Sequence, residues 1–174
     1  MPRLLVVLLN YRTAEMTLRA AEAALVALEG LDAEMVVVDN DSRDGSFERL
    51  SEAAKTRGWT AGGRVRVIQS GRNGGFGAGN NVGIRAGLCD GTAPDLVYLL
   101  NSDAFPAPDA IRRLCDALAG DPQAGLAGSY IHGPEGEPHV TAFRFPSVLS
   151  ELEGAARLGP LTRLLGDHRV PMEV

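Results

Sequence analysis

The sequence has few cysteines, few aromatic residues and no long apolar run. Two cysteines in 174 residues, Cys89 and Cys115, are too few for a disulfide framework. Each is interpreted as a small buried apolar residue in a reducing, cytoplasmic compartment. No apolar run approaches the roughly 20 residues of a membrane-spanning helix. A net charge of -5 provides no basic face for nucleic acid, whereas 45% hydrophobic residues can form a globular core.

Apolar runs alternate with helical patterns along the first 131 residues. Five strands are predicted, at residues 4–9, 34–38, 65–69, 96–100 and 124–131. The first and fourth are apolar throughout, which is typical of strands buried on both faces. Between them, helices are predicted from Thr13 to Gly30, from Asp44 or Ser46 through Ala54, over 80–88, and from a first turn containing Pro108. This order predicts an α/β fold, a Rossmann-like and mostly parallel sheet with helices on both faces.

The alternation stops after Ile131. A turn is predicted over residues 132–138, followed by a further strand at about 140–145. A helix is predicted over residues 147–165, with an interruption at Gly159 and Pro160. We therefore expect a main part over residues 1–131 and a second part over 132–174. The second part is expected to be the incomplete beginning of a further region.

Two common phosphate-binding loops are absent. The dinucleotide fingerprint needs glycines directly after the first strand, where this chain has Asn10 and Tyr11. A Walker loop needs Gly-Lys followed by Ser or Thr, a combination that the sequence lacks. The glycine cluster at residues 74–79 has neither spacing. The remaining scheme places acidic residues at strand ends, where a metal ion links them to a diphosphate.

Asn101, Ser102 and Asp103 follow the fourth strand directly. Ligands bind at the carboxyl ends of parallel strands, so these side chains are candidates for a site. Mg²⁺ takes one or two carboxylates together with substrate phosphates, which makes Asp103 a candidate metal ligand for Mg²⁺ or Mn²⁺. The same residues also suit an ordinary turn that caps the next helix.

Other polar residues follow the first and second strands. Asn10 and Tyr11 end the first strand, and Asp39 and Asp41 follow the second. A carboxylate can accept hydrogen bonds from a pyrimidine N3–H or from ribose hydroxyls. The segment from Asp41 onward is also rich in residues that begin helices.

The third strand is followed by Arg72, Asn73 and the glycine cluster. Glycines allow the backbone to approach a ligand closely, and Arg72 can offset phosphate charge. Asn80 and Asn81 either cap the next helix or contact a nucleotide. The alternative is a surface loop with a solvated arginine.

Four segments in register resemble the inverting glycosyltransferase family 2. They are Val6–Tyr11, Val36–Ser46, Asn73–Gly83 and Leu99–Ala104. The second segment is similar to the family's Val-Asp-Asn-x-Ser-x-Asp-Gly-Ser pattern. The last two are similar to those of its rhamnosyltransferase-like subgroup, in which Asn replaces the first Asp of Asp-x-Asp.

The resemblance implies a GT-A fold and a defined reaction. A sugar would be transferred with inversion from a nucleoside-diphosphate sugar, deoxythymidine-diphosphate rhamnose or a uridine-diphosphate sugar, to an acceptor hydroxyl. A glycan or lipid-linked acceptor, cell-surface glycan synthesis and peripheral association with the inner face of the plasma membrane would follow. The family's catalytic base lies in an acidic motif expected beyond Val174, and Glu151, Glu153 and Asp167 are not assigned that role.

Two other readings of the sequence stay open. One is a non-catalytic or truncated nucleotide-binding module. The other is a nucleotidyltransferase, which shares the sheet but usually has a basic, glycine-rich loop directly after the first strand.

Overall fold

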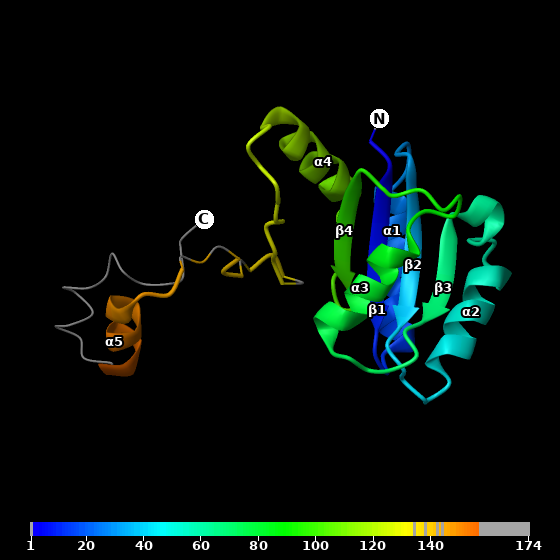
Figure 1. Ribbon diagram of the computed structural model, residues 1–174, viewed down its shortest axis with the longest axis horizontal. Helices are drawn as coiled ribbons and strands as arrows, with labels where there is room; N and C mark the ends of the chain where they lie inside the picture. The colour runs from blue at the N-terminus through cyan, green and yellow to red at the C-terminus, as the bar shows by residue number, and fades with distance from the viewer. Residues whose placement is uncertain (1, 134, 138, 142, 144, 157–174) are drawn as a thin grey trace. The chain divides into compact units, whose positions relative to one another are not determined.

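The computed structural model describes residues 2–133, 135–137, 139–141, 143 and 145–156. The chain divides into two compact units, residues 1–122 and residues 123–174 (Figure 1). The elements in order are β1 (Leu4–Asn10), α1 (Ala14–Ala27), β2 (Ala33–Asp39), α2 (Ser46–Thr56), a short 3-10 helix (Ala61–Gly63), β3 (Val65–Gln69), α3 (Phe76–Ala86), β4 (Leu96–Asn101), α4 (Ala110–Gly120) and α5 (Val148–Ala156).

The first unit is built on a four-stranded sheet with the strand order β3-β2-β1-β4. All three pairings are parallel, so all four carboxyl ends lie along one edge of the sheet. In register, Asn10 stands beside Asp39, Asp39 stands beside Gln69, and Leu9 stands beside Asn101. The parallel sheet predicted from the alternating pattern is therefore confirmed.

The central strand β1 is completely buried because helices cover both of its faces. Val6 and Leu8 pack in one apolar cluster with residues of α1, α2 and α4, whereas Leu5 and Val7 pack in a second cluster with residues of α3. Figure 1 shows α3 in front of the sheet. Alternate residues of a strand point to opposite faces, which is why a continuously apolar strand suits this position.

Helix α3 begins earlier than predicted and includes much of the glycine cluster. It spans Phe76–Ala86 rather than 80–88, so Asn80 and Asn81 lie inside the helix and do not cap it. A Cβ atom on Gly79 would lie 2.6 Å from Leu9 Cδ1, and one on Gly83 would overlap Val7. These two glycines therefore allow α3 to pack closely on the sheet, and the prediction that residues 76–79 belong to a loop was wrong.

Strand β4 and helix α4 also differ from the prediction in detail. β4 is an edge strand in the described sheet, and Val97 and Leu99 are 39% and 47% exposed rather than buried. Pro108 precedes α4, which begins at Ala110, and does not lie in its first turn. The predicted apolar face of α4 is confirmed, since Ile111 is buried and Cys115 packs against the same cluster.

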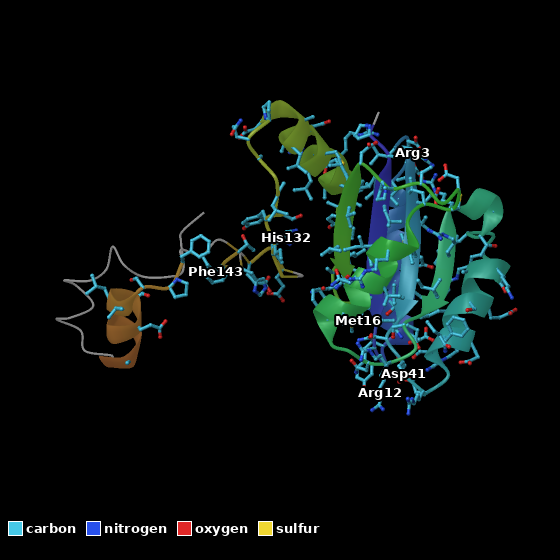
Figure 2. The ribbon with its side chains drawn as sticks, in the orientation of Figure 1. Arg3, Arg12, Met16, Asp41, His132 and Phe143 are labelled. Carbon is cyan, nitrogen blue, oxygen red and sulfur yellow. The ribbon has the colours of Figure 1, made fainter. Side chains whose placement is uncertain are left out.

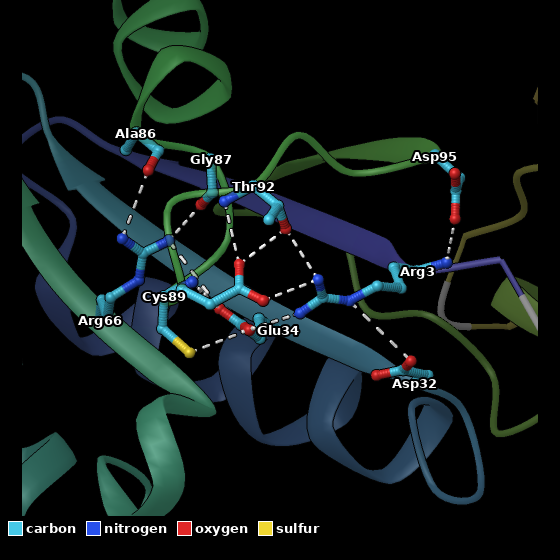
Figure 3. Close-up of polar contacts among 10 residues, drawn as sticks. Arg3, Asp32, Glu34, Arg66, Ala86, Gly87, Cys89, Thr92 and Asp95 are labelled. Carbon is cyan, nitrogen blue, oxygen red and sulfur yellow. Dashed lines mark hydrogen bonds and ion pairs between the residues drawn. The ribbon is translucent and has the colours of Figure 1, made fainter.

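A polar cluster links the amino ends of the strands, at the edge opposite the predicted site (Figure 3). Arg3 donates to Asp90 at 2.8 Å and to Thr92 at 2.7 Å, and lies 3.8 Å from Glu34. The exposed Cys89 donates its backbone N–H to Glu34 at 2.7 Å and its thiol at 3.1 Å. The prediction of a buried apolar residue is therefore wrong for Cys89. We interpret this cluster as structural, because its charges are paired with one another.

The lowered pKa of Asp90 leads to a prediction of how the stability of the fold changes with pH. Hydrogen bonds from Thr92 and then from Arg3 lower the pKa of Asp90 to about 2. A carboxyl group with a lowered pKa in the folded state stabilises the fold above its unfolded pKa of about 4, and this contribution is lost as the pH falls from about 4 to 2. We expect Asp90→Asn to reduce the acid-dependent loss of stability. Urea unfolding between pH 6 and pH 2 measures it, with Asp116→Asn as the control. Parallel losses in the two variants would contradict the assignment.

The second unit has little regular structure in its described part. Residues 124–131 form no strand, and Leu126 is 94% exposed. The predicted fifth strand is therefore wrong, and Gly125 and Gly128, which weaken a strand, offer a physical reason. The predicted turn is present, with Gly133 N–H donating to Glu137 O at 2.8 Å.

The later predictions for this unit are met only in part. In place of the strand at 140–145, the described residues contain single bridge positions at His132 and Phe143. Helix α5 confirms the first part of the helix predicted over 147–165, and residues 157–165 lie outside the described residues. No helix within the described ranges has the length and apolar character to cross a bilayer.

Candidate functional site

A buried polar network connects the carboxyl ends of β1 and β2. Asp39 Oδ1 accepts hydrogen bonds from Asn10 Nδ2 at 2.7 Å and from Ser42 Oγ at 2.5 Å, and Oδ2 accepts from the Ser42 backbone N–H at 3.2 Å. Asn10 and Ser42 are 0% exposed, and Asp39 is 1% exposed. In this low-dielectric environment the hydrogen bonds compensate the carboxylate for its lost hydration. Because Asn10 is buried, it holds Asp39 and Ser42 in position and is not itself open to a ligand.

The same network extends to the start of α1. Asn10 Oδ1 accepts a hydrogen bond from Thr17 Oγ1 at 2.8 Å, and Thr13 Oγ1 lies 3.4 Å from it. The Thr13 hydroxyl also donates to Ser102 Oγ at 3.2 Å. Thr13 thus precedes α1, as predicted, but its side chain links β1 to the turn after β4 and does not cap the helix.

The loop after β2 is a tight turn that presents Asp41. Asp41 and Arg43 have φ angles of 58° and 54°, in the left-handed region that favours glycine. Arg43 holds the Asp41 carboxylate with two contacts, at 3.0 Å and 2.8 Å. This guanidinium lowers the pKa of Asp41 below its usual value, and the backbone N–H of Asn73 contributes less. Asp41 is therefore a fixed, ionised acceptor at neutral pH.

A pocket of about 370 Å³ opens between the ends of β2 and β3 and the start of α2. Its volume is within the usual range for a small-molecule site. The lining residues are Asp39, Asp41, Arg43, Gly45, Ser46, Phe47, Glu48 and Gln69. The pocket combines carboxylates, one amide and one aromatic ring, which can accept, donate and pack against a nucleobase and its ribose.

The loop after β3 is joined to this region through Asn73. Asn73 Oδ1 accepts hydrogen bonds from the Asn40 amide at 3.1 Å and from the Gly75 N–H at 2.9 Å. Asn40 is only 3% exposed, so the contact fixes the loop from below. Arg72 and Asn81 are both exposed, Arg72 in the loop and Asn81 on α3. The loop therefore presents Arg72 to solvent close to the carboxyl edge.

The turn after β4 places Asn101, Ser102 and Asp103 at the same edge. The Ala104 N–H donates to Asn101 O at 3.2 Å, which closes the turn. Asp103 is exposed, and its carboxylate has no hydrogen bond or ion pair to the part of the chain that the structure describes. Tyr11, at the end of β1, is 42% exposed, with the Arg12 guanidinium 5.1 Å from its ring centroid.

The chemistry of this turn fits a divalent cation shared with a ligand. No cluster of three or more His, Cys, Asp or Glu side chains that could hold a metal occurs in the described ranges. The protein would thus supply one carboxylate, Asp103, with Asn101 available as a carbonyl ligand. Mg²⁺ and similar cations often bind in this way, completing their coordination with water and substrate phosphates.

Several residues of the site were not predicted. Ser42 and Thr17 complete the buried network, and Gln69 lines the pocket at the end of β3. Gln69 is the last residue of its strand, so the rule that selected Asp39 could also have found it. Thr17 lies one helical turn after Thr13, a weaker signal that only the fold makes visible.

The fold is that of the GT-A glycosyltransferases. The chain is similar to the mannosyltransferase PcManGT from Pyrobaculum calidifontis in complex with GDP-Man and Mn²⁺, with a TM-score of 0.63 and 24% identity over 77% of this chain and 36% of that one. It is also similar to S. aureus TarS 1-349, with a TM-score of 0.52 and 20% identity over 68% of this chain and 32% of that one. These two likenesses concern the fold.

The sequence comparisons give the family. Residues 5–167 match Glycosyl transferase family 2, and the chain belongs to this family. It is 34% identical over 130 residues to the succinoglycan biosynthesis protein ExoO of Rhizobium meliloti (strain 1021). That match covers 75% of this chain and 32% of ExoO, so the chain spans about a third of the length of its curated relative.

Proposed function

We propose that this chain is the donor-binding part of an inverting glycosyltransferase. The whole enzyme would transfer a sugar from a nucleoside-diphosphate sugar to an acceptor hydroxyl. The observation that carries the proposal is the exposed Asp103 carboxylate, free of described partners, at the same sheet edge as the pocket beside Asp41. Membership of Glycosyl transferase family 2 supports it.

The spacing of the strands supports one mode of donor binding. The pocket lies at the ends of β2 and β3, and Asp103 follows β4, with β1 between them. Neighbouring strands are about 4.8 Å apart, so β2 and β4 are separated by about 10 Å. An extended nucleoside diphosphate can bridge this distance. We place the base and ribose in the pocket, near Asp41 and Gln69, and the diphosphate toward Asp103.

The residues of this edge would act on the leaving group. A divalent cation on Asp103 would neutralise the charge that develops on the diphosphate as the sugar–oxygen bond breaks. Arg72 is exposed in the neighbouring loop and can add positive charge. The buried Asn10, Asp39 and Ser42 network keeps the strand ends in place. Deprotonation of the acceptor needs a general base, which we assign to no residue of this chain.

The identity of the donor and acceptor is part of the proposal. Deoxythymidine-diphosphate rhamnose is our first candidate donor, because the Asn73–Gly83 segment and the Asn101-x-Asp103 pattern resemble the rhamnosyltransferase-like subgroup. Uridine-diphosphate sugars are the second. Similarity to ExoO, named for succinoglycan biosynthesis, supports a glycan or lipid-linked acceptor. We place the protein at the cytoplasmic face of the membrane in cell-surface glycan synthesis.

A parallel measurement of binding and turnover tests the proposal. Calorimetry with deoxythymidine-diphosphate rhamnose, uridine-diphosphate sugars and GDP-mannose should detect binding that Mg²⁺ or Mn²⁺ strengthens. Release of the nucleoside diphosphate, measured with a coupled assay, should also depend on the metal. Binding without release would favour a non-catalytic nucleotide-binding module. A lack of binding to every donor in the presence of metal would refute the proposal.

A further inference from the structure

A second pocket, of about 350 Å³, lies in the first unit at the start of α1 and beside α2. Three arginines, Arg12, Arg19 and Arg49, contribute to its wall, together with Glu15 and Met16. Figure 2 labels Arg12 and Met16 in the same region of the ribbon as Asp41. None of the residues that line this pocket also lines the pocket assigned to the donor's base and ribose. It neighbours the turn that carries Asp103, because Thr13 in its wall donates to Ser102 at 3.2 Å.

The three arginines lack the ion pairs that some other arginines of this unit make. Arg43, Arg57 and Arg113 each contact a carboxylate. In contrast, Arg12, Arg19 and Arg49 make no ion pair with any residue in the described part of the chain. Glu15 is the one carboxylate in the wall of this pocket, so the wall has a net positive charge.

Each guanidinium group is held through its Nε atom, by an aromatic ring, or, for Arg12, by both. Arg12 Nε donates to Ser42 O at 3.2 Å, and Arg49 Nε donates to Gly45 O at 3.4 Å. The Arg19 guanidinium lies 5.1 Å from the centroid of the Phe105 ring. The two hydrogen bonds use Nε rather than the terminal nitrogens. Within the described residues, no acceptor is hydrogen-bonded to the terminal nitrogens of these three arginines. Five donors in a planar fork match the oxygens of a phosphate group, so three such groups around one pocket suit a phosphate better than a single carboxylate.

We propose that this pocket binds a phosphate group without a metal ion, as a site separate from the donor's diphosphate. The phosphate is either the headgroup of a lipid or part of a soluble phosphate compound. Met16, 40% exposed in the pocket wall, and Tyr11, 42% exposed beside Arg12, supply apolar surface next to the charges. The inference goes beyond the proposed transferase activity and does not depend on it.

Calorimetry with inorganic pyrophosphate in EDTA, at low ionic strength, tests the pocket directly. Arg19→Gln and Arg49→Gln should each weaken binding by about tenfold, because each removes a charge-assisted contact. Arg85→Gln is the matched control, since Arg85 is exposed on α3 and lines neither pocket. Arg72→Gln, at the edge proposed for the donor's diphosphate, should leave this metal-free binding unchanged, which separates it from the donor site. Equal affinities in both pocket variants and the Arg85→Gln control, or a loss in Arg72→Gln as large as in the pocket variants, would overturn the proposal.

Vesicle sedimentation distinguishes the two sources of phosphate. Phosphatidic acid in phosphatidylcholine vesicles presents a phosphate monoester, and phosphatidylglycerol at matched surface charge presents a diester. Binding to phosphatidic acid that is lost in Arg19→Gln would assign the pocket to a lipid headgroup. Pyrophosphate binding without vesicle binding would assign it to a soluble phosphate. If neither ligand binds, the proposal is wrong.

Discussion

Replacing Asp103 with alanine is expected to abolish metal-dependent binding of nucleoside diphosphates and to leave the fold intact. The side chain is exposed and has no described protein partner, so its removal costs no internal contact. A surface substitution of this kind changes the free energy of unfolding by about 0.5 kcal/mol or less. Its carboxylate is the only one in the turn after β4, so the cation would lose its protein charge. Calorimetry with and without Mn²⁺, together with urea unfolding, measures both effects.

The control for this prediction is another carboxylate of the same segment. Asp109 is exposed and forms an ion pair with Arg113 at 2.7 Å, but it lies outside the turn. Asp109→Ala should therefore retain metal-dependent binding. An Asp103→Ala variant with unchanged metal-dependent affinity would remove the assignment of Asp103 as a metal ligand.

Replacing Asp39 with alanine is expected to have the opposite profile, a large loss of stability. The Asn10 amide, the Ser42 hydroxyl and the Ser42 N–H would lose their acceptor in a region with almost no solvent access. Each buried donor left without a partner costs about 1–3 kcal/mol, so the total is expected to be about 3 kcal/mol or more. Urea unfolding measures the loss.

Nucleotide binding by Asp39→Ala should weaken even without metal, because the loop that carries Asp41 begins at the affected residues. Ser42→Ala is the comparison, since it removes one hydroxyl and keeps the carboxylate. It should lose less stability than Asp39→Ala. If Asp39→Ala unfolded at the same urea concentration as the parent and bound nucleotide equally well, neither the structural nor the binding role of Asp39 would stand.

Much of the sheet could be predicted because its two central strands, β1 and β2, carry apolar residues on both faces. Continuous runs such as Leu4–Leu9 suit only a strand covered on both faces, and the polar residues that follow them mark the carboxyl ends. The limits of α3 could not be predicted in this way. Its glycines suit a loop by local preference, but Gly79 and Gly83 allow the close approach of helix and sheet, a tertiary effect.

The sequence also selected candidate site residues without separating their roles. Because all three lie at or just after the end of a strand, Asn10, Asp39 and Asp103 are equally good candidates for ligand contact. In the structure, Asn10 and Asp39 are buried and bonded to each other, whereas Asp103 is exposed and its carboxylate has no partner in the described part of the chain. Burial of this kind depends on how α1 and the loop at residues 41–45 close over the strand ends. Short-range sequence patterns do not contain that information.

The position of β1 in the sheet has a consequence for how the protein is made. Leu4 pairs with Ala33 on one side and with Leu96 on the other. During synthesis, one edge of β1, which is apolar from Leu4 to Leu9, therefore stays unpaired until β4 has left the ribosome. Pairings between segments so distant in the chain form slowly and leave hydrophobic surface open to aggregation. Co-translational folding of this unit should thus depend on chaperones until β4 closes the free edge of β1.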